Sequence, residues 1–195
     1  DGVEIAFHDD PDVLTISVHE TDRWPYTGAV TDRAGGMARN IPVPKGLIDS
    51  EHALILAQAV IPLVGDFAPD ALVIQCGCDG LDSDPQSKLS LSNRAIWDAV
   101  GRLLPLAPRA LVLGGGGYNP WGVARCWSGI WGVLNGHEVP AFLPDGAEQV
   151  LRDLTWNHSR GKNPPDFWFT TLADRPNPGP VRPEIHDLIR EVLRT

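Results

Sequence analysis

The 195-residue sequence has no apolar run near the roughly 18 residues that a membrane-spanning helix needs. It also has little positive charge, since 16 Lys and Arg stand against 25 Asp and Glu for a formal net charge of -9. General nucleic-acid binders neutralise phosphates with clustered basic side chains, and this composition argues against that class. A signal-peptide pattern is lacking as well. We therefore expect neither a membrane nor a nucleic acid as partner.

Cysteine and methionine are both scarce. The three cysteines are an odd number, which favours reduced thiols in a cytoplasm over a disulfide framework. Cys76 and Cys78 are not spaced as a C-x-x-C pair, and we expect both sulfurs to lie in or near the core. Met37 is the only methionine, so the sequence begins at Asp1 without an initiator. By composition alone, a cleaved tag and a truncated chain explain this start equally well.

Three short β-rich runs predict strands, at residues 13–18, 71–76 and 110–113. The second and third are almost wholly apolar, as in strands buried on both faces of a parallel sheet. Helical patterns alternate with them over residues 50–64, 93–104 and 121–134, and a last short helix is expected over residues 183–193. This alternation predicts βαβ units, hence an α/β fold with a parallel sheet flanked by helices.

The predicted helix over residues 121–134 has the clearest ends. Asn119 is its expected N-cap, Pro120 lies in the first turn, and Gly136 closes it. For the helix over residues 50–64 we expect Asp49 as N-cap and a kink or end at Pro62. Residues 157–183 are expected to be ordered but irregular. The apolar stripe of the 121–134 helix is expected to comprise Val123, Trp127, Ile130, Trp131 and Leu134.

Two polar segments follow the second and third predicted strands. Asp79 lies in QCGCDGLDSDP, and Tyr118 follows the four glycines of LVLGGGGYNP. Because ligands of open α/β sheets bind outside the carboxyl ends of the strands, both side chains face one pocket if the strands are neighbours. A tyrosine hydroxyl can donate to an oxygen that becomes negative, and glycines let a carbonyl approach closely. With Asp79 as a metal ligand, the pattern indicates amide hydrolysis by a metal-activated water.

A dinucleotide site and a calcium loop fit the same residues less well. The glycine run fails the G-x-G-x-x-G spacing of a dinucleotide site. The spacing of Asp79, Asp82 and Asp84 does not fit an EF-hand, and turn formation explains Asp82 and Asp84 better. A catalytic zinc needs about three protein ligands, and the ones besides Asp79 are not visible.

The segments LVIQCGCDGLDSDP, LVLGGGGYNPWGVARCW, LTISVHE and WPYTG together resemble the histone deacetylase superfamily. That superfamily includes bacterial acetoin-utilisation deacetylases and acetylpolyamine amidohydrolases, and the resemblance runs from Asp1 to about Gly136. It implies an arginase-like α/β fold and zinc-dependent removal of acetyl groups from acetylated amines. It also implies that residues 1–195 are the C-terminal part of one deacetylase domain, with a core at 1–136 and an irregular extension at 137–195.

The resemblance implies roles for single residues. Asp79 corresponds to the second zinc-binding aspartate, and Tyr118 to the tyrosine that polarises the scissile carbonyl. Trp24 stands where the family has an aromatic wall of the acyl-lysine tunnel. The remaining implied positions are Gly116 and Gly117 lining the pocket, a potassium site at Ser17 and Val18, and a second potassium site at the carbonyls of Phe7, Asp10 and Val13, with a fourth carbonyl near Met37.

Two departures from the family stand out. The tunnel motif, usually Phe-Pro-Gly-Thr-Gly, is WPYTG over residues 24–28, which reshapes the expected pocket mouth. Of the motif D-x-H-H-G-D-G-V only the last three residues are present, so the other zinc ligands and the acid/base histidines are missing. We expect a cytoplasmic parent deacetylase that acts on an acetylated amine, and an inactive 195-residue chain whose partner is the missing N-terminal half. The alternative is a non-catalytic interaction or self-association module, including a homo-oligomer.

Overall fold

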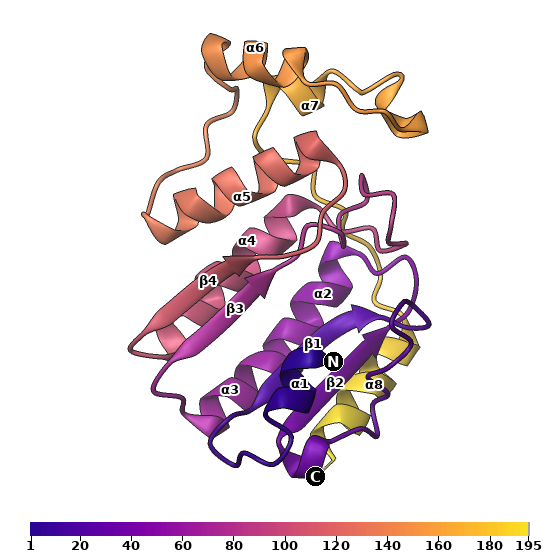
Figure 1. The fold of residues 1–195 in the computed structure, drawn as a ribbon, viewed down its shortest axis with the longest axis vertical. Helices are drawn as coiled ribbons and strands as arrows, with labels where there is room; N and C mark the ends of the chain where they lie inside the picture. Colours follow the sequence, from indigo (N-terminus) through magenta and orange to yellow (C-terminus); the bar gives the residue numbers. More distant parts are fainter. Residues whose placement is uncertain (195) are drawn as a thin grey trace.

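Parallel strand pairs flanked by helices make up the computed structural model, which describes residues 1–194 (Figure 1). Strand β1 (Thr15–Glu20) pairs with β2 (Ala38–Val43), and β3 (Leu72–Cys76) pairs with β4 (Ala110–Gly114). Over these residues the two pairs form separate two-stranded sheets. The α/β class predicted from the sequence is confirmed, and so is the neighbour relation between the two strands that lead to Asp79 and Tyr118.

Helices make up much of the rest of residues 1–194. Within residues 1–194, none combines the length and the apolar character needed to cross a membrane. The sequence patterns missed β2 and the helices α1, α6 and α7. The helices are α1 (Gly2–Ala6), α2 (Asp49–Ile55), α3 (Ile61–Phe67), α4 (Asn93–Leu103), α5 (Pro120–Leu134), α6 (Asp145–Asp153), α7 (Phe167–Thr170) and α8 (Pro183–Leu193), with short helical turns η1 (Ala34–Gly36), η2 (Leu56–Val60), η3 (Leu104–Leu106) and η4 (Ser159–Gly161).

Segments α2, η2 and α3 run on as one helical stretch over residues 49–67, so of the kink or end expected at Pro62 the end is wrong. The hydrogen bonding widens to a π-helical turn just before this proline, which lacks the N–H that an α-helix requires there. The N-cap is Ile48 and not Asp49. The Asp49 carboxylate instead accepts hydrogen bonds from Ser92 N–H and Oγ–H and from Asn177 N–H, which ties three distant segments together.

Helix α8 packs beside β2 and completes the first hydrophobic core, as Figure 1 shows. Its bounds agree with the predicted range, and Ile185, Ile189 and Val192 are buried. The end of the helix is held by the guanidinium of Arg33, which donates to the carbonyl oxygens of Glu191, Val192 and Arg194. The C-terminal segment is therefore part of the core that the strands build.

Helix α5 packs against α4 through small residues, so the apolar stripe expected for it is wrong at Trp127, Trp131 and Leu134, which are exposed. The Trp97 ring of α4 lies directly on Gly129, and its Nε1–H donates to the Cys126 carbonyl at 2.8 Å. A larger residue at position 129 would occupy the space of the indole. The helix therefore rotates its small side inward, and Trp131, at 61% exposure, points to solvent.

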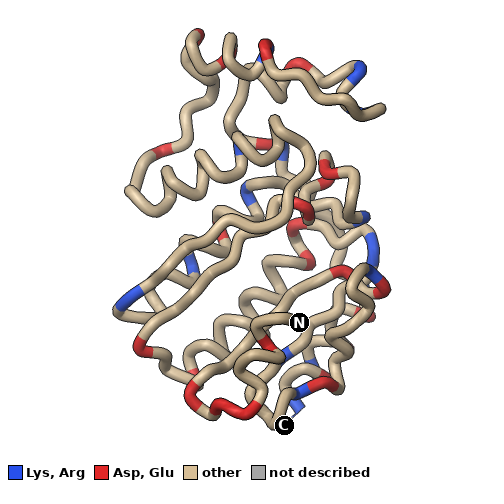
Figure 2. The backbone as a smooth tube through the Cα atoms, in the orientation of Figure 1, with Lys and Arg blue, Asp and Glu red and all other residues tan. Residues whose placement is uncertain are grey.

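The β3–β4 sheet has one apolar face that no described residue covers. Side chains alternate along a strand, so Ile74, Cys76 and Val112 pack into the second core while their neighbours point the other way. Val73, Leu111 and Leu113 form this outward face and are 61%, 55% and 43% exposed. Both strands carry no charge along their length (Figure 2). An uncharged apolar face on a two-stranded sheet favours association.

We predict that the 195-residue chain alone self-associates through the outward face. Its scattering mass should rise with concentration, and a variant with both Leu111→Lys and Leu113→Lys should stay close to the monomer mass, because buried like charges oppose the contact. Val150→Lys, at an exposed apolar position on α6, is the matched control and should behave as the parent chain does. A monodisperse monomer at every concentration would contradict this expectation.

Candidate functional site

The loops that follow β3 and β4 meet at the carboxyl ends of these strands. We call residues 77–91 the aspartate loop and residues 115–119 the tyrosine loop. Cys76 pairs with Gly114 as the last residues of the two strands, and the next contact carries the pairing into the loops, since Cys78 N–H donates to the Gly116 carbonyl at 2.6 Å. The segments that carry Asp79 and Tyr118 are thus brought together, as the sequence hypothesis requires.

The Asp79 carboxylate lies on the backbone of the glycine run. A Cβ atom on Gly116 would lie 2.6 Å from the Asp79 Cγ, so a larger residue there would displace the carboxylate. Gly117 has a φ of +147°, and a Cβ on it would lie 2.5 Å from the Val123 Cγ2. Gly116 and Gly117, the two residues that precede Tyr118, thus allow close approach of Asp79 and of the start of α5, respectively. Close packing within the chain therefore explains the glycines, in addition to any approaching ligand.

Asp84 joins the two loops through its carboxylate. It is only 2% exposed, and its Oδ2 accepts the Tyr118 N–H at 2.6 Å while its Oδ1 accepts the Gln86 N–H at 2.8 Å. Burial raises the pKa of the Asp84 carboxyl, and the Asp79 charge adds to this, while the N–H donors of Gln86 and Tyr118 oppose it. The sequence analysis treated Asp84 as a turn residue, and no feature of the pattern distinguished it from exposed Asp82.

Two more side chains hold the same loops. The Asn119 Oδ1 caps α5 by accepting the N–H groups of Trp121 and Gly122, as predicted. The Asn119 Nδ2 donates to the Ser83 carbonyl in the aspartate loop at 3.3 Å. Arg160 reaches in from η4, where its Nη1 donates to the carbonyls of Asp82 and Asp84 at 3.0 and 3.1 Å. The sequence patterns did not identify Arg160, which lies in a stretch without periodicity.

The Tyr118 side chain is 52% exposed and faces outward from this junction. Trp24 lies in the loop after β1 and is 84% exposed, so it lines no closed tunnel within residues 1–194. Its loop is nevertheless tied to the aspartate loop, because the Glu20 carboxylate accepts both the Arg23 Nε–H at 2.9 Å and the Lys88 N–H at 2.8 Å. The loop that carries Trp24 is thus attached to the site, while the Trp24 ring is exposed to solvent.

The first implied potassium position lies on β1. The Ser17 hydroxyl makes a 2.9 Å hydrogen bond with His19 Nδ1, and the His19 Nε2 is 3.0 Å from the Gly28 carbonyl oxygen. Val18 follows in the same strand, paired in register with Ile41. The hydroxyl is therefore engaged with a histidine in this structure, and the potassium assignment stays a prediction.

The second implied potassium position spans two consecutive turns. The Phe7 carbonyl accepts the Asp10 N–H at 3.1 Å, and the Asp10 carbonyl accepts the Val13 N–H at 3.3 Å. Nearby, the Met37 carbonyl accepts the Thr15 N–H at 2.9 Å, which brings residue 37 next to this segment. Backbone hydrogen bonds thus link Phe7, Asp10 and Val13 in succession, and Met37 lies against Thr15, two residues further on. Binding of an ion by their carbonyl oxygens stays a prediction.

Asp79 is the one expected zinc ligand in the chain, and the structure tests what surrounds it. Across residues 1–194, no three His, Cys, Asp or Glu side chains form a group that could hold a metal ion. The glycine backbone leaves space for the carboxylate, which suits a ligand, but one carboxylate is far short of the usual set of about three. The described residues therefore fit zinc as the donor of a single ligand and do not complete a site.

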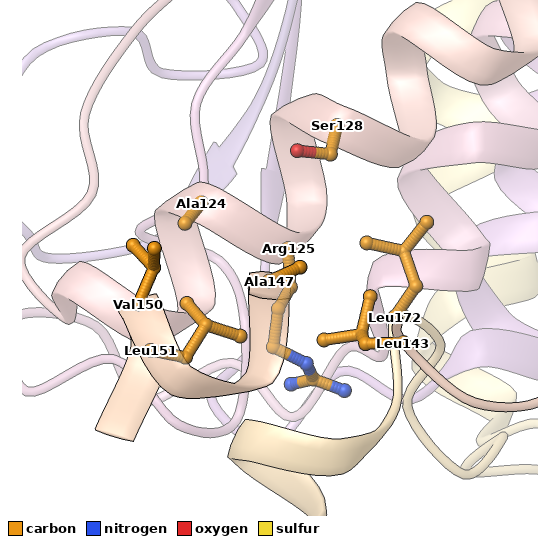
Figure 3. A pocket seen from close by; sticks show the side chains of 8 residues that line it. All are labelled: Ala124, Arg125, Ser128, Leu143, Ala147, Val150, Leu151 and Leu172. Carbon is orange, nitrogen blue, oxygen red and sulfur yellow. The ribbon is translucent and has the colours of Figure 1, made fainter. Parts of the chain in front are cut away.

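A separate cavity of about 310 Å³ lies between α5 and α6 (Figure 3). Its walls are mostly apolar, and none of its lining residues belongs to the aspartate or tyrosine loop. The guanidinium of Arg125 in it is already paired, since its Nη1 lies 2.7 Å from the Asp174 Oδ1 and its Nε donates to the Thr171 carbonyl at 2.6 Å. The cavity is lined by Ala124, Arg125, Ser128, Leu143, Ala147, Val150, Leu151 and Leu172.

All three cysteines are free and buried near the site, as the sequence led us to expect for Cys76 and Cys78. Burial raises the pKa of the Cys76 thiol to about 11, and the neighbouring Cys78 adds to this. A hydrogen bond with Cys78 raises the pKa of the Cys126 thiol, and burial raises it further. The Cys76 and Cys126 thiols are therefore protonated, and burial shields all three thiols in the folded chain.

We predict that these thiols resist labelling in the folded state. At pH 8 a thiol with a pKa of about 11 has roughly 100-fold less thiolate than one with the ordinary value of 9.0. Titration with a disulfide reagent at pH 8 should give almost no fast reaction, and full reaction of all three after unfolding in denaturant. Rapid labelling of any of them before unfolding would show that the site is more open than its burial indicates.

Comparison with known proteins gives consistent matches. A family profile described as "Histone deacetylase domain" matches residues 1–134. Histone deacetylase 19 of Arabidopsis thaliana is 35% identical over 150 residues, covering 74% of this chain and 30% of that protein. The acetoin utilization protein AcuC of Bacillus subtilis is 31% identical over 202 residues, covering 95% of this chain and 49% of that protein.

The solved structures agree. A crystal structure of an HDAC homolog from Aquifex aeolicus superimposes with a TM-score of 0.89 at 32% identity, covering 98% of this chain and 53% of that one. The chain therefore spans less than half the length of the curated relatives named above.

Proposed function

The chain belongs to the histone deacetylase family, and we propose that the full-length protein is a zinc-dependent deacetylase of acetylated amines. Its substrate would be an acetyl-lysine, an acetylpolyamine or a similar acetylated amine. The observation that carries the proposal is the junction of the aspartate and tyrosine loops. It holds the Asp79 carboxylate against Gly116 and leaves the Tyr118 side chain half exposed.

In the proposed reaction, Tyr118 donates its hydroxyl proton in a hydrogen bond to the acetyl carbonyl oxygen. The bond strengthens as negative charge develops on this oxygen, so it stabilises the transition state more than the bound substrate. Asp79 would supply one ligand to a zinc ion that, when bound, polarises the carbonyl and activates water. Gly116 leaves room for this carboxylate on the backbone two residues before Tyr118.

The substrate and ion positions carried by the resemblance belong to the same proposal. The exposed ring of Trp24 is proposed to form an aromatic wall for the acylated side chain, and its loop is anchored to the site through Glu20. Potassium is proposed at Ser17 and Val18. A second potassium is proposed at the carbonyls of Phe7, Asp10 and Val13.

The surroundings of the chain are proposed from its exposed and buried groups. The apolar outward face of β3–β4 supports coverage by another part of the deacetylase domain or by a second copy. The free cysteines fit a reducing compartment such as the cytoplasm. A non-catalytic association module is the alternative function, and the same face favours it.

We predict that Tyr118→Phe in the full-length protein lowers kcat about 100-fold, the usual effect of losing one donor to a developing oxyanion. Metal content, measured by elemental analysis, should stay unchanged. The control is Phe142→Leu, at an exposed aromatic residue outside both loops, which should keep turnover within about twofold. Near-normal deacetylation by the Tyr118 variant would exclude the proposed role.

We predict that the 195-residue chain alone binds zinc weakly or not at all. One carboxylate leaves the ion largely hydrated, and the described residues supply no group of three ligands. Equilibrium dialysis with elemental analysis measures the stoichiometry, and Asp79→Asn is the comparison. Tight equimolar zinc that is lost in this variant would mean that the chain completes the site on its own or with a second copy.

A further inference from the structure

We propose that Asp84 is a positioning residue that sets the backbone of Tyr118 relative to Asp79. The inference rests on the proposed role of Tyr118 and adds a residue that acts through it. Asp84 would touch neither substrate nor metal. Its carboxylate accepts the N–H of the very residue whose hydroxyl is proposed to do the chemistry, and that bond is short at 2.6 Å.

The burial of Asp84 argues that this bond is more than a turn contact. A carboxylate that is 2% exposed has lost its water, and this cost is offset only by hydrogen bonds from the protein. Both oxygens receive one, from Tyr118 on one side and Gln86 on the other. Asp82, two residues earlier in the same loop, is exposed and forms no comparable bridge between the described loops.

Hydrogen bonds fix the tyrosine loop on both sides of Tyr118, and Asp84 fixes the backbone of Tyr118 itself. The tyrosine loop is held before Tyr118 by the Cys78 bond to Gly116, and after it by the Asn119 bond to Ser83. Tyr118 has its own N–H fixed by Asp84 between these two points. Its ring therefore starts from a backbone that cannot turn independently of the aspartate loop, which also carries Asp79.

Arg160 supports Asp84 from outside the region that the family profile matches. Its Nη1 donates to the main-chain carbonyls of Asp82 and Asp84, so it holds the loop from behind while the carboxylate points at Tyr118. Arg160 is exposed and belongs to η4, so it can be changed without opening a core. A change at Arg160 therefore tests the positioning role of Asp84 independently.

The first test is Asp84→Asn in the full-length protein, with Asp82→Asn as the matched control. Asparagine has one oxygen, so it can satisfy only one of the two N–H groups and turns an NH2 toward the other. We expect kcat to fall about tenfold or more with KM and bound metal nearly unchanged, since misplacing a catalytic group costs mostly turnover. The control should stay within about twofold.

A double-mutant cycle separates positioning from general damage. If Asp84 acts through the Tyr118 hydroxyl, adding Asp84→Asn to Tyr118→Phe should lower kcat no further. An equal fall in both backgrounds overturns the proposal, because a merely structural loss does not depend on the hydroxyl. If Tyr118→Phe alone has no effect, the proposed function fails. The positioning of Tyr118 by Asp84 is then judged by a readout that does not use turnover.

That readout is hydrogen–deuterium exchange at the Tyr118 amide. Asp84→Asn should speed it about tenfold while Asp82→Asn leaves it unchanged, because only the first replaces the charged acceptor and leaves one oxygen for the two N–H groups of Tyr118 and Gln86. Should Asp84→Asn fail to fold, Arg160→Gln decides, with an expected exchange about threefold faster at the same amide and a kcat loss that vanishes in the Tyr118→Phe background. Unchanged exchange at Tyr118 in the folded variant overturns the proposal.

Discussion

The parallel pairing of β3 with β4 is the constraint on which the candidate site depends. It ends both strands at the same level and continues as the Cys78–Gly116 hydrogen bond, so the two loops cannot separate. The contacts within the candidate site follow from the closeness of these two loops. The Asp79 carboxylate lies on the backbone of Gly116, and the buried Asp84 carboxylate receives its second donor, the Tyr118 N–H, because the tyrosine loop is within reach.

Much of the frame could be predicted from the sequence because local signals agreed with the fold there. The apolar runs of β3 and β4, the Asn119 cap and the range of α8 are confirmed. Strand β2 was missed because Arg39, Asn40 and Pro42 interrupt its apolar pattern, although Asn40 is buried by bonds to Glu4 and Asp32. Periodicity reports which residues are apolar, and it does not report what lies opposite them.

The site shows the same division. Asp79 and Tyr118 were found because each follows a recognisable strand, and the family match supports the pairing of these two segments. Asp84 and Asp82 look alike in sequence, and only the tertiary path of the tyrosine loop makes one a buried acceptor and leaves the other in water. Arg160 lies 76 residues from the carbonyl of Asp84 that it holds, a separation over which local pattern carries no information.

The contact of Trp97 with Gly129 couples helix packing to the site. Gly129 lies ten residues after Asn119 on a helix that rises about 1.5 Å per residue, so a shift at the indole is transmitted along a rigid rod to the tyrosine loop. The side chains at positions 97 and 129 therefore compete for the same space. In related chains with this geometry, a larger residue at 129 should be accompanied by a smaller one at 97, so the two positions should vary together across evolution.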